Sequence, residues 1–146
     1  MLEKISYKKA PPEIVNALVK LYQNGQFEDV LSRSPQLIKE YPDTLELHNI
    51  LGTINFIKGN KKEALKHFHI MIKLNPTNPH AYNYLGVALL DFKEYNKAQK
   101  AIKKAIKLKP NYAEAYNNLG NVYKNINQYD LAIQEYKKAI NIAPLY

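Results

Sequence analysis

Four prolines divide the chain into equal intervals. Pro42, Pro76, Pro110 and Pro144 each lie 34 residues from the next. Self-similarity at a fixed period of about 20 to 50 residues is typical of repeat architectures, in which each unit buries its apolar face by stacking on its neighbours. Because proline lacks the N–H group that a helix interior needs, each of these prolines is expected to follow the end of a helix. The interval therefore predicts a stack of four similar helical units.

Small and apolar residues keep the same period. Gly52, Gly86 and Gly120 each follow a leucine, and Gly25 and Gly59 are expected in the turns between helices. Within a repeat, apolar residues advance by threes and fours, which is the spacing of one helix face. Each repeat is therefore predicted to hold two helices that meet at small residues. Two further sets recur at this period: Ala64, Ala98 and Ala132, and Ile38, Ile72, Ile106 and Ile140.

The pattern resembles the tetratricopeptide repeat (TPR) family, whose signature is W-x2-L-G-x2-Y, then A-x3-F, then P. In this chain it reads Tyr82-x2-Leu85-Gly86-x2-Leu89, Ala98-x3-Ile102, Pro110, and again Tyr116-x2-Leu119-Gly120-x2-Tyr123, Ala132-x3-Tyr136, Pro144. The resemblance implies an all-α, right-handed α-solenoid of four helix-turn-helix repeats. It places a lead segment at 1–10 and a TPR domain at 11–146, with repeats 11–44, 45–78, 79–112 and 113–146.

The first two repeats depart from this pattern. Repeat two has His48 and Asn55 at places where the family has aromatic residues, and we expect His48 to be a core residue. Repeat one has Leu18 at the glycine place and Ser34 at an apolar place. Pro35 lies inside its second helix, where it predicts a kink or break near Leu31.

The residues needed for catalysis or cofactor binding are not brought together by the sequence. The chain has no Cys, which excludes thiol nucleophiles and Cys-ligated metals. His67 and His69 are two apart on a predicted helix and point in different directions, so they cannot chelate one metal. The five glycines are spread singly and form no phosphate-binding loop. We therefore expect a non-enzymatic protein with no cofactor and no metal.

The net charge and the N-terminal sequence indicate where the protein resides and do not indicate a ligand. The formal net charge is +8, but only one of the 21 basic residues, Arg33, is an arginine, the usual reader of phosphates and base edges. The cluster Lys97, Lys100, Lys103, Lys104 and Lys107 is expected to be a solvated helix face rather than a nucleic-acid site. The first 13 residues lack the apolar region of a secretory signal, and no apolar run approaches the ~20 residues of a membrane span. We expect a cytoplasmic protein.

By resemblance, a TPR domain binds its ligand on the concave face lined by the first helix of each repeat. The chain places asparagines there in register, and each amide could pair with the N–H and C=O groups of an extended peptide. Apolar residues at the same places favour a hydrophobic segment of a partner protein. The candidate groove residues are Asn49, Asn83, Asn117, Asn118, Asn121, Asn125, Val19, Tyr22, Ile50, Phe56, Tyr84, Val87 and Leu90.

The leading hypothesis is an adaptor or scaffold that binds a peptide or helical segment of another protein in this groove. One alternative is the TPR arm of a longer, glycosyltransferase-like enzyme, because the fourth repeat finishes at Tyr146 without a closing helix. Another is a scaffold that forms a homo-oligomer through its uncapped end, since solenoids normally carry a polar cap. The candidate self-association residues are Tyr129, Ala132, Tyr136 and Ala139.

Overall fold

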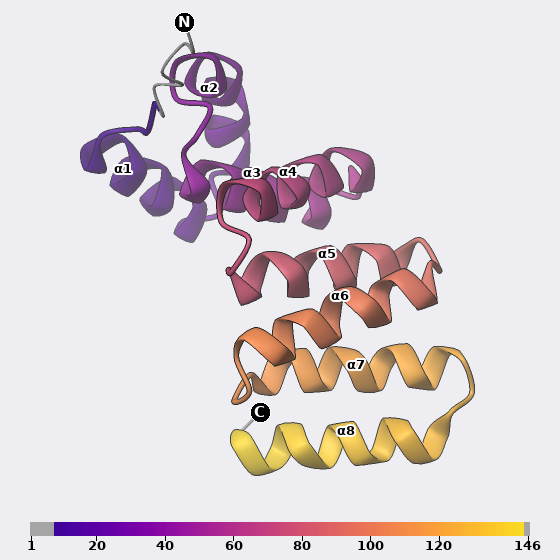
Figure 1. Ribbon diagram of the computed structural model, residues 1–146. Coiled ribbons are helices and arrows are strands. Elements are labelled where there is room, and N and C mark those ends of the chain that lie inside the picture. The colour runs from indigo at the N-terminus through magenta and orange to yellow at the C-terminus, as the bar shows by residue number, and fades with distance from the viewer. Residues whose placement is uncertain (1–7, 145–146) are drawn as a thin grey trace, which may run out of the picture. The chain divides into compact units, whose positions relative to one another are not determined.

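A computed structural model describes residues 8–144. This part of the chain forms eight α-helices and contains no strand (Figure 1). Of the expected lead segment, residues 1–7 lie outside the described residues, as do residues 145–146 of the fourth repeat. The helices are α1 (Pro12–Gln23), α2 (Phe27–Glu40), α3 (Leu45–Ile57), α4 (Lys61–Leu74), α5 (Pro79–Asp91), α6 (Tyr95–Leu108), α7 (Ala113–Asn125) and α8 (Tyr129–Ile142).

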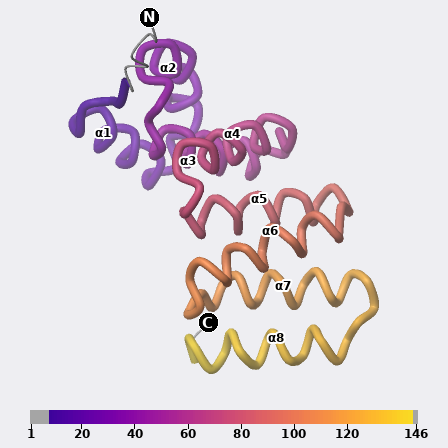
Figure 2. The backbone as a smooth tube through the Cα atoms, in the orientation of Figure 1, coloured from indigo at the N-terminus to yellow at the C-terminus, as the bar shows by residue number. Residues whose placement is uncertain are grey.

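The chain folds as two compact units, Met1–Leu74 and Asn75–Tyr146. In the second unit, α5 and α6 form one helical hairpin, α7 and α8 form another, and α6 packs against α7 (Figure 2). In the first unit, α3 and α4 form a hairpin of the same kind, and α1 and α2 both contact α3. The all-α helical-repeat fold predicted from the 34-residue period is confirmed.

A left-handed backbone conformation recurs in the turn inside every repeat. Gly25 and Gly59 have φ angles of +71° and +79°, and Lys93 and Asn127, at the same place of the next repeats, both have φ of 60°. Glycine takes this conformation without the steric penalty that a Cβ atom brings. The turn is therefore set by the geometry of the helix pair, even where the sequence offers a lysine.

The three regular hairpins are closed by a glycine in the first helix. A Cβ atom on Gly52 would lie 2.5 Å from Cε1 of Phe68, which is too close for any real contact. The same is true of Gly86 against Ile102 and of Gly120 against Tyr136. The missing side chain lets the large residue of the second helix lie directly on the backbone of the first. The expectation that these glycines mark close helix crossings is confirmed.

Repeat one packs differently because both residues of this contact are replaced by residues of another kind. Leu18 occupies the glycine place and Ser34 the place of the large partner. Leu18 is buried together with Val30 and Leu47 in the core of the first unit, so α1 packs on α3 as well as on α2. A pocket of about 320 Å³ lies between α1 and α2. Its lining residues are Ile14, Ala17, Leu18, Arg33, Gln36, Leu37 and Glu40.

Of the kink or break expected near Leu31, the break does not occur, since α2 continues from Phe27 to Glu40. Pro35 has no N–H to donate to the carbonyl of Leu31, four residues earlier. The hydroxyl of Ser34 donates to that carbonyl at 2.8 Å instead. Because the freed acceptor is satisfied locally, the helix continues through the proline.

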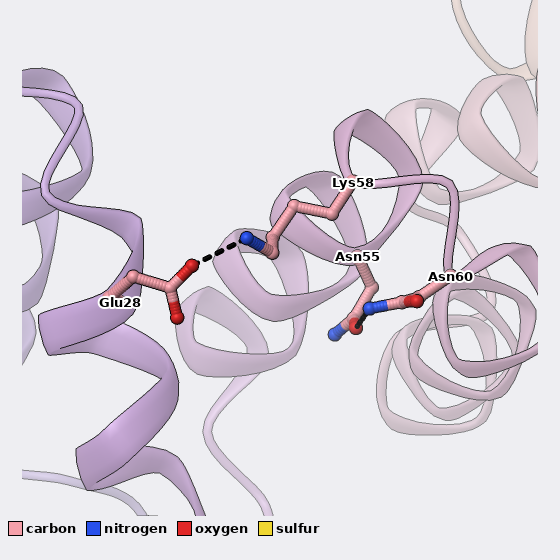
Figure 3. Close-up of polar contacts among 4 residues, drawn as sticks. All are labelled: Glu28, Asn55, Lys58 and Asn60. Carbon is pink, nitrogen blue, oxygen red and sulfur yellow. Dashed lines mark hydrogen bonds and ion pairs between the residues drawn. The ribbon is translucent and has the colours of Figure 1, made fainter.

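Polar contacts stabilise the turn between α3 and α4 in the first unit (Figure 3). Lys58, after α3, forms an ion pair with Glu28 of α2 at 2.5 Å, and Glu28 is largely exposed, so the pair contributes at most about 1 kcal/mol. Asn55 is buried at a place where the other repeats have Leu89 and Tyr123. Its amide donates to the carbonyl of Leu51 at 2.9 Å and accepts from Asn60 at 3.3 Å. Both polar ends of Asn55 are thus paired, which explains why an amide is tolerated there.

Backbone contacts also hold the segment before α1. The N–H of Ala10 donates to the buried hydroxyl of Thr44 at 2.7 Å, and the N–H of Lys8 donates to Asp43 at 3.2 Å. These bonds join the entry of α1 to the linker between α2 and α3. The start of repeat one is therefore fixed by the start of repeat two.

Replacing Gly86 by alanine is expected to lower the free energy of unfolding by about 1–3 kcal/mol, because the new methyl group overlaps Ile102. Urea denaturation of the full chain measures this. Asn96→Ala on the exposed surface of α6 is the matched control, with an expected change of less than about 0.5 kcal/mol. The additional substitution Ile102→Val should recover part of the loss, and a Gly86→Ala protein as stable as wild type would contradict the close-contact interpretation.

Candidate functional site

The asparagine at the centre of the predicted ladder is part of the core. Asn83 on α5 is completely buried. Its amide nitrogen donates to the hydroxyl of Tyr112 at 3.2 Å and to Glu114 at 3.0 Å, and its oxygen accepts from Asn118 at 3.0 Å. These bonds connect α5 to α7. The prediction that Asn83 presents a free amide to a peptide is therefore wrong, because its donors and acceptor are used inside the unit.

Tyr112 extends this network to the rim of the second unit. Its hydroxyl lies 2.9 Å from Nδ1 of His80 and accepts a hydrogen bond from Asn83, so its own O–H can donate a hydrogen bond to His80. Burial lowers the pKa of His80, and the nearby charge of Lys109 lowers it further, which favours the neutral, accepting imidazole. The amine of Lys109 lies 4.9 Å from the centre of the Tyr112 ring. The repeat pattern did not single out Tyr112, although this residue lies directly before α7.

The other candidate asparagines differ in their surroundings. Asn117 is half-buried on α7, and the structure records no hydrogen bond of its side chain with the described residues. Asn121 accepts a bond from the hydroxyl of Tyr136 at 2.8 Å, and exposed Asn125 donates to the backbone carbonyl of Asn121 at 2.8 Å. Asn49, in the first unit, is half-buried, and its buried side-chain oxygen has no partner among the described residues. The 34-residue register predicted that these asparagines are equivalent, but in the structure they differ in burial and in hydrogen-bond partners.

The apolar candidates divide into core and surface residues. Ile50 is 6% exposed and belongs to the core of the first unit, so its assignment to a groove surface is corrected. Val19 and Tyr22 on α1 are half-buried and pack against that core. The remaining candidates are half-buried and reach the surface: Phe56 on α3, and Tyr84, Val87 and Leu90 on α5.

The predicted self-association residues are mostly internal. Ala132 and Ala139 are each 3% exposed, and the ring of Tyr136 covers Gly120. Of the four candidates only Tyr129 is exposed. The prediction is therefore wrong for Ala132 and Ala139, because they are the small residues that α8 turns toward α7. The exposed large hydrophobic residues of α8 are Tyr129, Leu131, Ile133 and Ile140.

A pair of histidines is buried in the first unit. His48 on α3 and His67 on α4 are in contact through their Nδ1 atoms at 2.9 Å, and Nε2 of His48 lies 2.8 Å from the carbonyl of Pro42. That carbonyl can only accept, so Nε2 of His48 carries a proton and Nδ1 of His67 is the donor between the rings. The expectation that His48 is a core residue is confirmed. His67 is buried beside it, and His69 is exposed.

Burial opposes protonation of His67. Burial, and then the proximity of His48, lower the pKa of His67 from 6.5 to about 4. Among the other charged neighbours, Glu63 raises that pKa and Lys66 lowers it. His67 is therefore neutral near pH 7.

The five lysines of α6 lie on its exposed side, as expected of a solvated face. Lys97 forms an ion pair with Glu94, and the amine of Lys103 lies 5.7 Å from the ring centre of Tyr123. Within residues 8–144, no three acidic or histidine side chains are grouped so that they could hold a metal ion. No helix among the described residues has the length and apolar character needed to cross a membrane.

The paired helices and their repeated contacts define a helical-repeat protein. Tetratricopeptide repeat models match residues 79–112 and 101–134. A crystal structure of MamA is 31% identical, covers 86% of this chain and 73% of that one, and has a TM-score of 0.77. The chain belongs to the tetratricopeptide repeat family, whose members are protein-interaction modules.

Two further solved structures share the fold. MamA 41-end from Desulfovibrio magneticus RS-1 is 19% identical over 91% of this chain and 75% of that one, with a TM-score of 0.81. The TPR2B domain of yeast Sti1, in a complex with pHsp70, is 24% identical over 67% of this chain and 78% of that one, with a TM-score of 0.65. None of the curated proteins compared with the chain matches it.

Asn83→Ala is expected to lower the free energy of unfolding by about 1–3 kcal/mol, because it leaves buried partners unsatisfied. Urea denaturation of the full chain, followed by circular dichroism, measures this. Asn125→Ala, at an exposed place on α7, should change stability by less than about 0.5 kcal/mol. Equal stabilities of the two variants would show that the Asn83 network is not structural.

Stability is expected to fall as the pH drops from about 6.5 to about 4. In this range the unfolded chain binds a proton at His67 that the folded chain does not, so acid lowers the free energy of unfolding by up to about 3 kcal/mol. Denaturation midpoints across this pH range provide the measurement. The double variant His48→Tyr/His67→Ala, which copies Tyr82 and Ala101 of repeat three, should lose this dependence, whereas His69→Ala should keep it. An unchanged pH dependence in the double variant would assign the effect to other groups.

Proposed function

We propose that the second unit binds a segment of a partner protein along the surface formed by Tyr84, Val87 and Leu90 of α5 and by Asn117 and Asn121 of α7, so that the protein acts as an adaptor or scaffold. This surface is called the α5/α7 face below. The first helices of the two repeats contact each other, so these side chains can act together.

The supporting observation is the combination of half-exposed apolar side chains with an amide that has no recorded bond. Tyr84, Val87 and Leu90 are three apart and lie along one side of α5. Asn117 offers two donors and one acceptor beside them, which suits the backbone of an extended segment. Aromatic and aliphatic side chains that surround a few polar groups are typical of peptide-binding surfaces.

The Asn83 network supports this proposal indirectly. Asn83 and Asn118 form a partly buried hydrogen bond between α5 and α7, which fixes the spacing of the two helices before a ligand arrives. A surface that is ordered in advance loses less conformational entropy on binding. The TPR2B domain of Sti1, solved in a complex with pHsp70, is an example of the same fold with a bound ligand.

In the first unit, equivalent places hold Val19, Tyr22, Asn49 and Phe56. We include them in the proposal as a second, separate contact surface. Their contribution can be measured independently, because they lie in a different compact unit from the α5/α7 face.

The test selects peptides from a random peptide library on the wild-type chain and measures their affinity for variants. Val87→Asp should weaken selected peptides by about 10- to 100-fold, because it places a charge in an apolar contact. Asn117→Ala should weaken them by about 5- to 10-fold, the value of one or two hydrogen bonds. Asn96→Ala, on the exposed surface of α6, is the matched control and should bind as wild type. Peptides that bind all four proteins equally would overturn the proposal.

A further inference from the structure

The outermost helix of the second unit carries an exposed apolar stripe. Tyr129, Ile133 and Ile140 of α8 are 58%, 50% and 53% exposed. They are spaced by four and seven residues, with half-buried Tyr136 between them, which is the spacing of a helix-pairing seam. These four residues are called the α8 stripe.

The preceding repeat shows what this helix face can accept. In α6 the places equivalent to the three exposed stripe residues are Tyr95, Gln99 and Ile106, and all three are half-buried. They lie on α6, which packs against α7. The amine of Lys103, also on α6, lies 5.7 Å from the ring centre of Tyr123 on α7. This helix face is therefore suited to packing against another helix. On α8, no described residue of the second unit covers it.

The first helix of another copy is a poor occupant. α3 and α7 carry buried apolar residues at three places of one helix face, whereas α1 carries exposed Glu13, Ala17 and Lys20 there. Covering them with α8 would remove two charged groups from water without a partner. Head-to-tail stacking of copies is thus disfavoured. The apolar residues at these places are Leu47, Leu51 and Ile54 in α3, and Ala115, Leu119 and Val122 in α7.

The charges beside the stripe fit another α8. Asp130 and Lys137 are both exposed, seven residues apart, and lie on the same flank of the stripe. When two identical helices pair in antiparallel orientation, equivalent flanks face each other. Each Asp130 then lies near Lys137 of the second copy, which gives two opposite-charge contacts in one interface.

We propose that α8 pairs with α8 of a second copy in antiparallel orientation, through Tyr129, Ile133 and Ile140, with Asp130 facing Lys137 of the other copy. The interface is isologous, so it closes as a two-fold dimer and leaves the α5/α7 face of both copies unused. The proposal is independent of the proposed peptide binding, because no residue is shared between the two surfaces.

Sedimentation equilibrium of the full chain from about 1 µM to 1 mM tests the pairing. Wild type should approach twice the monomer mass of 16.9 kDa as the concentration rises. Ile133→Lys should raise the dissociation constant by about 100-fold, as for loss of a central interface anchor. Leu131→Lys is the matched control, because Leu131 is exposed on the opposite side of α8, and it should dimerise as wild type. A wild-type chain that stays monomeric, or a dimer that Ile133→Lys does not weaken, would overturn the proposal.

Charge reversal tests the orientation. Asp130→Lys and Lys137→Asp should each dimerise about 5- to 10-fold more weakly than wild type, because like charges then face each other. A mixture of these two variants should form a heterodimer at least as tight as the wild-type dimer, since opposite charges again face each other at both contacts. Circular dichroism confirms that each variant is folded. A mixture no tighter than the single variants would overturn the antiparallel arrangement.

Discussion

The geometry of this protein depends on the contact between a glycine in the first helix of a repeat and a large side chain in the second helix. At Gly52, Gly86 and Gly120 the ring or branched chain of the second helix fills the space that a Cβ atom would occupy. Dense packing leaves no room for adjustment at such a point. The closely packed antiparallel hairpin follows from this contact, whereas the left-handed turn is common to all four repeats. Repeat one lacks the contact, and there the helices separate enough to leave a pocket.

Substitutions at repeated places are accommodated by local hydrogen bonds. Ser34 donates to the carbonyl that Pro35 leaves free, and the amide of Asn55 is bonded at both ends where another repeat has an aromatic ring. His48 similarly finds partners in His67 and in the carbonyl of Pro42. A buried polar group destabilises a fold only when it is unpaired. The family pattern can therefore change at these places without a change of fold.

In the second unit, asparagines at the same place of two successive repeats differ in burial. Asn83 joins α5 to α7 and is inaccessible to any ligand, whereas Asn117, at the same place of the next repeat, is half-exposed. The difference arises because Tyr112 and Glu114 precede and begin α7 and bond to Asn83. On α8, no helix among the described residues of the second unit covers the stripe. Equivalent places in a repeat thus acquire different uses from their neighbours.

The period of 34 residues, the helix spacing and the glycine places were enough to predict the all-α repeat fold, because they express local geometry that recurs in each unit. The same pattern could not tell Asn83 from Asn117, or the buried Ala132 from the exposed Ile133. Those differences depend on which side chains of other helices lie beside each residue, such as Tyr112 beside Asn83 and Gly120 beside Tyr136. The sequence by itself determined the repeat and its helices. Only the tertiary structure decided which polar groups are consumed in the core and which faces remain available, since burial depends on residues that are distant in the chain.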